Sequence, residues 1–240
     1  MEKPSILKVL EDAQLAHQAG DFVNALKFYE YFFDHALEDD PYAYYGARLS
    51  HCLQGWTELA GTFPGAKNAL ERKKREMLDH YLTQGRDPER FHDYLAICRG
   101  LGSEADALEQ FLSLHHAEPK SAAKLSKFLW DDLINAEHWN VCSDLMEQTN
   151  LKLDELFAIF DEAAKLKEAD PAFNNIKFEQ HIVNTLLDDV QRVVMVLRHA
   201  DRGDEIPALQ RQFELAATQR DHPILTKQMH AKGSFLFAGH

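Results

Sequence analysis

The sequence of 240 residues has few of the residues that interrupt helices, with 11 Gly and 8 Pro. Alternating apolar and polar runs rich in Val, Ile and Thr are almost absent, which argues against β-strands. The common residues are Ala, Leu, Glu, Gln, Lys and Asp, most of which favour helices. The composition therefore predicts an all-α protein, and the length suffices for one compact domain or a short solenoid.

Cysteine is also scarce, and the three thiols form no recognisable motif. Cys52, Cys98 and Cys142 are widely spaced, each lies in an apolar stretch, and no Cys-x-x-Cys occurs. Zinc sites and thiol–disulfide centres use closely spaced pairs of cysteines. We therefore expect three buried, reduced thiols, as is usual in a cytoplasmic protein.

Segments that direct a chain to or into a membrane are absent from the sequence. No apolar run approaches the length needed to span a bilayer. Residues 1–5 have neither the basic nor the apolar region of a signal peptide. The expectation is a cytoplasmic protein that does not bind or cross a membrane.

Positive charge is in deficit, because 26 Lys and Arg stand against 39 Asp and Glu, a net charge of −13. A surface this acidic repels phosphate backbones and anionic headgroups, so we expect no nucleic-acid partner. Basic residues cluster once, between Lys67 and Arg75. We interpret this cluster as a solvated helix face, and a patch for a partner is the alternative.

Apolar residues recur at helical spacing along the chain, and part of the pattern repeats every 41 residues. Glycines at expected bends, small residues where helices would cross, and large apolar residues one turn later keep this interval. These sets are Gly20, Gly61 and Gly102; Ala25, Ala66 and Ala107; and Tyr29, Leu70 and Phe111. Repetition of this length predicts an α-solenoid of stacked antiparallel helical hairpins.

The unit around Gly102 carries a more specific pattern. Its members are Phe91, Tyr94, Leu95, Cys98, Gly102, Ala107, Phe111, Leu114 and Pro119. At this spacing the unit resembles the tetratricopeptide repeat, although Leu95 replaces a small residue of that family and Cys98 an aromatic one. The resemblance implies a tetratricopeptide-like right-handed superhelix. HEAT-type repeats, which also exceed 40 residues, are the alternative.

The repeat pattern loosens towards the C-terminus, which suggests a division of the chain. We assign residues 1–150 to tetratricopeptide-like hairpins and 151–231 to further helical hairpins, with helices over 152–168 and 175–200 and a break at Pro171. Residues 232–240 hold apolar residues between glycines and are predicted to be a tail. The tail either docks on its own domain or enters a neighbouring subunit, which would make a homodimer.

No motif in the sequence directly predicts catalysis, since His-Glu-x-x-His, Gly-x-Ser-x-Gly and the P-loop are absent. The pair His92-Asp93 resembles that of the HD-type metal-dependent phosphohydrolases, which need two further ligands. Candidates for these are His51, His80, Asp131 and Asp132. However, His51 precedes His92 by 41 residues, so the repeat explains both histidines. We expect no cofactor and no enzyme, with an HD-like hydrolase as the alternative.

A binding groove is the remaining functional candidate. In tetratricopeptide-like arrays the first helix of each hairpin lines a concave groove that holds a peptide or a partner helix. The resemblance assigns to this groove Gln14, His17, Gln18, Arg48, His51, Glu58, His92, Arg99, Lys124, Lys127 and Asn135. Its cations favour an acidic peptide or a C-terminal carboxylate. The sequence thus predicts a non-enzymatic scaffold for protein–protein interaction.

Overall fold

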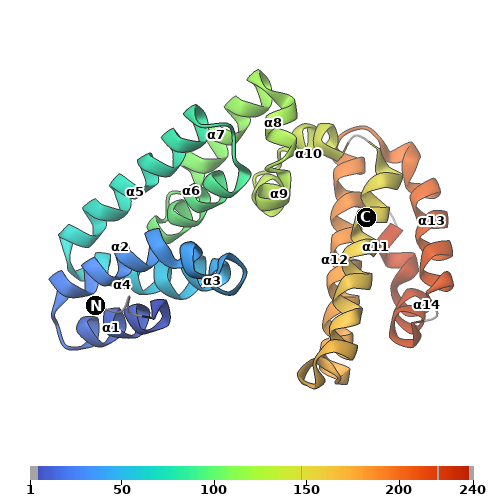
Figure 1. The fold of residues 1–240 in the computed structure, drawn as a ribbon. Coiled ribbons are helices and arrows are strands. Elements are labelled where there is room, and N and C mark those ends of the chain that lie inside the picture. The colour runs from blue at the N-terminus through green and yellow to red at the C-terminus, as the bar shows by residue number, and fades with distance from the viewer. Residues whose placement is uncertain (1–4, 147, 221, 238–240) are drawn as a thin grey trace. The chain divides into compact units, whose positions relative to one another are not determined.

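The computed structural model describes residues 5–146, 148–220 and 222–237, and every regular element in these ranges is helical (Figure 1). The predicted all-α class is therefore confirmed. The chain divides into two compact units, Met1–Leu129 and Trp130–His240. This division lies within helix α9 (Ser126–Asn135), earlier than the boundary that the sequence placed at residue 150.

The first unit is built from long helices joined by short connections. Their bounds are α1 Ile6–Gln18, α2 Phe22–Asp39, α3 Pro41–Ala47, the π-helical turn η1 Arg48–Cys52, α4 Leu53–Thr62, α5 Pro64–Thr83, α6 Pro88–Leu101, α7 Glu104–Ala117 and α8 Pro119–Ala123. Helix α1 packs on α2, α4 packs on both α2 and α5, and α6 packs on α4, α5 and α7. Each inner helix thus contacts the helices before and after it along the chain.

Most residues that the sequence placed at the 41-residue interval are buried in this unit. The buried members are Ala25, Ala66, Ala107, Tyr29, Leu70 and Phe111. Phe22 and Phe63, which are also 41 residues apart, contact each other with ring centroids 6.2 Å apart. Two of the three predicted sets at this interval are therefore core positions.

Glycine ends two helices in the predicted way. Gly20 and Gly102 have φ of +78° and +66°, in the left-handed region that glycine enters without a steric penalty. Directly after Gly20, the Asp21 carboxylate accepts a hydrogen bond from the backbone N–H of Asn24 and so caps α2. These local signals fix the bends between α1 and α2 and between α6 and α7.

The middle bend lies elsewhere than predicted. Helix α4 continues past Gly61 to Thr62, and the chain turns at Phe63, which is extended with φ −119° and ψ 105°. Pro64 begins α5, and a proline disfavours helical conformation in the residue before it. The predicted bend at Gly61 is therefore wrong, because proline sets this helix boundary and glycine does not.

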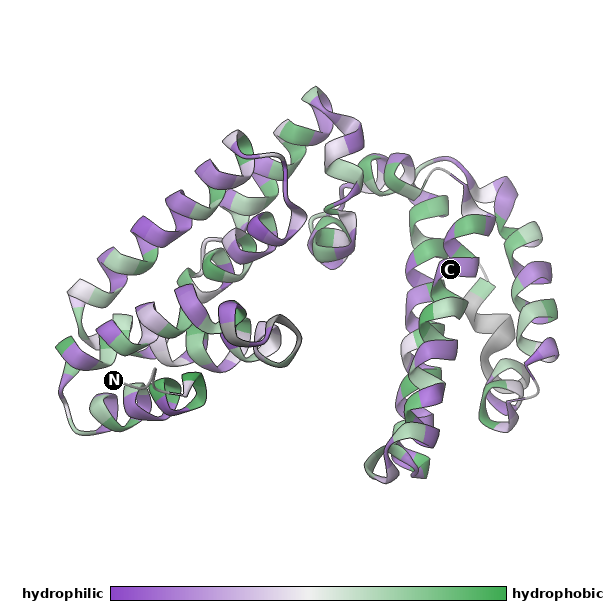
Figure 2. Ribbon diagram, viewed as in Figure 1, coloured by the Kyte–Doolittle hydropathy of each residue, from purple (hydrophilic) through white to green (hydrophobic). Residues whose placement is uncertain are grey.

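The second unit contains α10 Trp139–Met146, α11 Thr149–Ala169, the 3₁₀ turns η2 Pro171–Phe173 and η3 Gly203–Glu205, α12 Ile176–His199, α13 Ile206–Gln219 and α14 Pro223–Phe237. Helix α12 packs on α10, α11 and α14, and α13 packs on α11 and α14. The predicted helices over 152–168 and 175–200, separated at Pro171, are confirmed. Hydrophobic and hydrophilic residues alternate around these helices, as amphipathic packing requires (Figure 2).

The prediction of a tail over residues 232–240 is wrong for residues 232–237, which belong to a helix. Helix α14 continues through Gly233 to Phe237, and residues 238–240 lie outside the described part of the chain. The Phe237 ring contacts Phe213 of α13, with centroids 5.9 Å apart. A glycine within a helix costs only about 1 kcal/mol relative to alanine, which docking of the helix can offset.

Among the helices described, none combines the length and hydropathy that crossing a bilayer requires.

Candidate functional site

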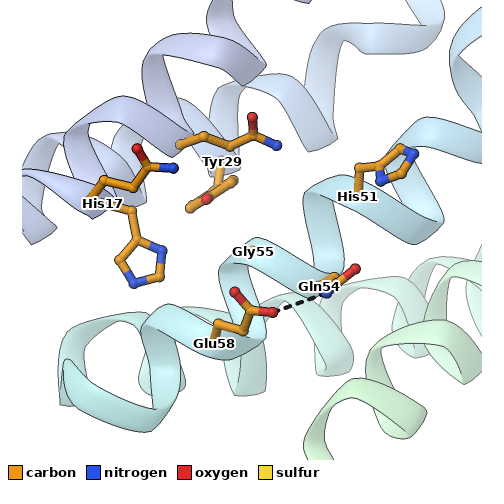
Figure 3. Close-up of a pocket in the computed structure, with 8 residues that line it drawn as sticks. His17, Tyr29, His51, Gln54, Gly55 and Glu58 are labelled. Atoms are coloured by element: carbon orange, nitrogen blue, oxygen red, sulfur yellow. Dashed lines mark hydrogen bonds between the residues drawn. The ribbon is translucent and has the colours of Figure 1, made fainter.

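Helices α1, α2 and α4 of the first unit border an open cavity of about 500 Å³ (Figure 3). Five residues that the sequence assigned to a groove line it: Gln14, His17, Gln18, His51 and Glu58. Tyr29, Gln54 and Gly55 complete the lining. The structure therefore brings five of the six groove residues predicted for the first two repeats together around one cavity of the first compact unit; the sixth is Arg48.

A second cavity, of about 550 Å³, adjoins the first between α4 and α6. Its lining includes the predicted residues His92 and Arg99, together with Ala96 and Gly100. Gln54 and Glu58 line both cavities, and the Gln54 side-chain amide donates a hydrogen bond of 3.0 Å to the Glu58 carboxylate. We call the two cavities together the groove.

The 41-residue interval also relates the positions that line the groove. One set is Gln14, Gly55 and Ala96, another is His17, Glu58 and Arg99, and a third is His51 and His92. The second set changes from an imidazole to a carboxylate to a guanidinium. The groove is therefore made of repeated positions whose charge varies along its length.

Two glycines permit the close helix contacts beneath the groove. A Cβ atom on Gly55 would lie 2.4 Å from the Tyr29 hydroxyl, and one on Gly100 would lie 2.8 Å from the Thr57 hydroxyl. Burial, with Cys52 and Glu58 nearby, raises the pKa of Tyr29 to about 12, so its hydroxyl keeps its proton at neutral pH. The sequence interpretation missed Gly55 and Gly100, although the interval to Ala96 marks Gly55 as a small-residue position.

Aromatic and cationic side chains gather around His92 in the second cavity. Its ring stacks on Phe128 with centroids 4.1 Å apart, and its Nδ1 is 2.7 Å from the Tyr45 hydroxyl. The Lys127 Nζ lies 4.8 Å from the centroid of the Phe128 ring. Arg99 is exposed and donates a hydrogen bond of 3.1 Å to the Phe128 carbonyl oxygen. This end of the groove is therefore positive.

We expect the first unit to lose stability as the pH falls from about 6.5 to about 4, because of His92. Burial, and then Arg99, Arg48 and Lys127, lower its pKa from 6.5 to about 4. In that pH window the unfolded chain binds a proton that the folded chain does not, so the free energy of unfolding rises with pH. Urea unfolding at several pH values measures this slope, and His92→Gln should reduce it. An NMR titration of His92 with a midpoint near 6.5 would contradict the assignment.

Arg48 does not line the groove, which corrects its predicted role. It is 1% exposed and forms an ion pair with Asp93, which is also 1% exposed. The Arg48 guanidinium lies over the Phe33 ring, 4.5 Å from its centroid. Arg48 begins the π-helical turn, and its side chain enters the core between α2 and α6, where burial of a cation requires an opposite charge.

The remaining predicted cations and Asn135 do not line either cavity. Lys124 follows α8 and is exposed, and Lys127 is exposed in the first turn of α9. Asn135 is exposed at the end of α9 and belongs to the second compact unit. Lys127 nevertheless lies close to His92, because its Nζ is 4.8 Å from the centroid of the Phe128 ring on which His92 stacks.

The alternative metal site around His92 and Asp93 is not assembled. The Asp93 carboxylate pairs with Arg48, whereas the His92 ring stacks on Phe128. Of the residues proposed as further ligands, His51 lines the first cavity, His80 lies on α5, and Asp131 and Asp132 belong to the second unit. Within the ranges that the structure describes, no three His, Cys, Asp or Glu side chains are placed to hold a metal ion.

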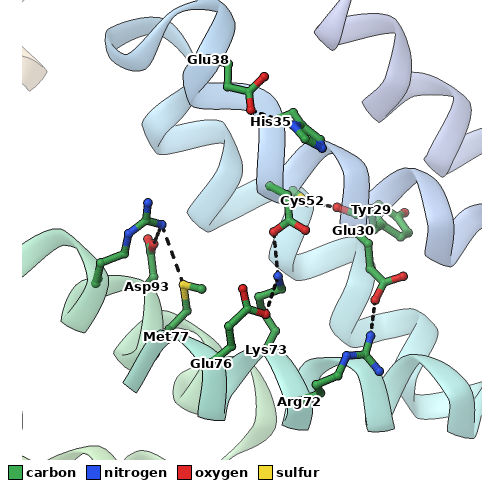
Figure 4. Close-up of polar contacts among 12 residues, drawn as sticks. Tyr29, Glu30, His35, Glu38, Cys52, Arg72, Lys73, Glu76, Met77 and Asp93 are labelled. Atoms are coloured by element: carbon green, nitrogen blue, oxygen red, sulfur yellow. Dashed lines mark hydrogen bonds and ion pairs between the residues drawn. The ribbon is translucent and has the colours of Figure 1, made fainter. Parts of the chain in front are cut away.

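Three cations of the basic cluster between Lys67 and Arg75 form ion pairs with other helices of the first unit; Figure 4 shows those of Arg72 and Lys73. These ion pairs are Arg72–Glu30, Lys73–Asp34 and Lys74–Asp106, with distances of 2.6, 2.8 and 3.0 Å. Lys73 is only 7% exposed. The interpretation of this cluster as a solvated face is therefore wrong for Lys73 and Lys74, which connect α5 to α2 and α7, whereas Arg72 is exposed and reaches Glu30 across the surface.

All three cysteines are buried free thiols, as predicted. Burial raises the pKa of each thiol, so none is poised as a thiolate.

Comparisons with protein-family models, with curated proteins and with solved structures find no match.

Proposed function

We propose that this protein is a non-enzymatic interaction module that binds an extended segment of a partner protein in the groove. The observation that carries the proposal is the pair of adjoining cavities that share Gln54 and Glu58. Together they offer a continuous lining from α1 to α6, which suits an elongated ligand better than a compact small molecule.

The same proposal includes the finer architecture of residues 5–129, a tetratricopeptide-like solenoid of helical hairpins. Its support is the 41-residue interval, which relates buried contacts such as Ala25, Ala66 and Ala107 as well as the lining of the groove. In such an array each hairpin adds one equivalent segment to an extended binding surface.

The chemistry of the lining suggests the kind of segment that binds. The side-chain amides of Gln14, Gln18 and Gln54 can both donate and accept hydrogen bonds, as an extended peptide backbone requires. Arg99 and Lys127 supply positive charge at the His92 end, where an acidic side chain or a C-terminal carboxylate would form charge-assisted hydrogen bonds. Glu58, in the middle, favours a cation or a hydrogen-bond donor.

The experiment is a selection of displayed random peptides on the purified protein, followed by measurement of the affinity of the selected peptides. We expect enrichment of peptides with an acidic residue or a free C-terminal carboxylate. The double variant Arg99→Glu, Lys127→Glu should weaken their binding by about tenfold or more, because two attractive charges become repulsive. Its helical content, measured by circular dichroism, should stay unchanged, since both side chains are exposed.

A matched control separates local recognition from the change in net charge. The double variant Lys67→Glu, Lys120→Glu has the same net charge as the groove variant, and its two lysines are exposed on α5 and α8. This control should retain the affinity of the parent chain. Equal losses in both variants, or a selection without any acidic preference, would contradict the proposed groove.

A further inference from the structure

The second unit has an apolar cavity of about 190 Å³ on its surface, between α11 and α12. Helix α11 contributes Ile159, Ala163 and Leu166, and α12 contributes Phe178, Ile182 and Leu186. Ile159 and Leu166 are 56% and 43% exposed, so the apolar surface continues from the cavity to its rim. Covering such a surface with another apolar surface is favourable, and contiguous patches of this kind mark interaction sites.

Two opposite charges stand on α12 beside this cavity. Lys177 and Asp188 are both exposed, and neither has an ion-pair partner among the residues that the structure describes. They are 11 residues apart, which is about three helical turns, so both side chains lie on the same side of α12. That side adjoins His181 and Thr185, which line the cavity.

The apolar and charged residues share one centre. Midway between Ile159 and Leu166 on α11 are residues 162 and 163, and midway between Lys177 and Asp188 on α12 are residues 182 and 183. The two helices run antiparallel, and the ion pair between Lys167 and Glu179 joins them near their connected ends. Ala163 and Ile182 line the same cavity, so the two midpoints lie at about the same level along the helices, within roughly one helical turn.

We infer that this face is the interface of a homodimer, in which a second copy of the chain lies antiparallel on α11 and α12. A two-fold axis through the shared centre brings Ile159 against Leu166 of the second copy. The same axis brings Lys177 against Asp188 of the second copy. Each contact occurs twice, because a two-fold interface presents the same surface from both copies. The face is therefore complementary to a second copy of itself at the apolar pair Ile159 and Leu166 and at the charged pair Lys177 and Asp188.

The first test is the mass of the full chain in solution, measured by sedimentation equilibrium over a wide range of concentrations. We expect a concentration-dependent species of twice the 27.5 kDa chain mass. Ile159→Asp should reduce it to the monomer, whereas Leu215→Asp, on an equally exposed leucine of α13, should leave the dimer intact. A monomer at every concentration, or equal effects of the two variants, would overturn the inference.

The second test uses the symmetry of the charges. Lys177→Glu and Asp188→Lys should each weaken dimerisation by about tenfold or more, because each creates two like-charge contacts. A mixture of the two single variants should form a heterodimer, in which both contacts join opposite charges again. The chain that carries both substitutions should dimerise like the parent. Failure of the mixture to associate would show that Lys177 and Asp188 do not meet, and would overturn the proposed register.

Discussion

Replacing Asp93 with alanine is expected to lower the free energy of unfolding of the first unit by about 3–5 kcal/mol. The substitution leaves the Arg48 guanidinium buried without its counter-charge. Solvation of a cation cannot be recovered in the core, and the Phe33 ring, 4.5 Å away, offers only part of what the carboxylate supplied. Few other single substitutions in this unit leave an unpaired charge in the core.

Unfolding of the first unit can be followed separately through Trp56. The sequence has three tryptophans, and the other two, Trp130 and Trp139, lie in the second unit. In a chain with Trp130→Phe and Trp139→Phe, urea unfolding monitored by fluorescence therefore reports on the first unit. We expect the midpoint to fall sharply on addition of Asp93→Ala.

An apolar replacement of the whole pair is the control for this prediction. Arg48→Met together with Asp93→Leu removes both charges at similar volume, and exchange of a buried ion pair for well-packed apolar residues is often neutral or stabilising. The double variant should be more stable than Asp93→Ala alone. If Asp93→Ala loses less than about 1 kcal/mol, the value typical of an exposed pair, Arg48 reaches solvent or another partner.

The contrast between Arg48 and its neighbours shows what a sequence pattern can predict. Gln14, His17 and Glu58 lie on the regular helices α1 and α4 where the 41-residue register put them, because an ideal helix turns each side chain by a constant angle. Arg48 and His51 both lie in a π-helical turn, in which this angle changes. His51 still lines the groove, whereas the Arg48 side chain enters the core. Its partner Asp93 is 45 residues away, and no local signal in one sequence announces such a pair.

Some helix ends depend on local signals, and others depend on contacts between helices that are distant in the sequence. The bends at Gly20 and Gly102 follow from the conformational freedom of glycine, and both were predicted. At Gly61 the same expectation failed because Pro64 determines where the next helix starts. The contact between Phe237 and Phe213 depends on how α14 packs on α13, so the sequence alone suggested a tail where the structure has a helix.

Trp56 is the second position where a single substitution should have a large effect. Its side chain is fully buried, contacts the Phe33 ring edge-to-face with centroids 6.1 Å apart, and donates a hydrogen bond of 3.2 Å to the Ala66 carbonyl oxygen. Trp56→Ala should cost about 3–5 kcal/mol, because a cavity of this size cannot be filled by the surrounding helices. Circular dichroism during urea unfolding measures the loss.

Trp56→Phe separates the contribution of volume from that of the hydrogen bond. It keeps an aromatic ring against Phe33 and removes the indole N–H, so we expect a smaller loss of about 1–2 kcal/mol.

Trp56 also lies on α4, whose opposite face carries Gln54 and Glu58 at the centre of the groove. Trp56→Ala should therefore weaken the binding of selected peptides even at temperatures where the first unit stays folded, because α4 loses the contact that holds it against α2 and α5. Unchanged peptide affinity in a destabilised Trp56→Ala chain would show that the groove does not depend on the position of α4, and would contradict the proposed site.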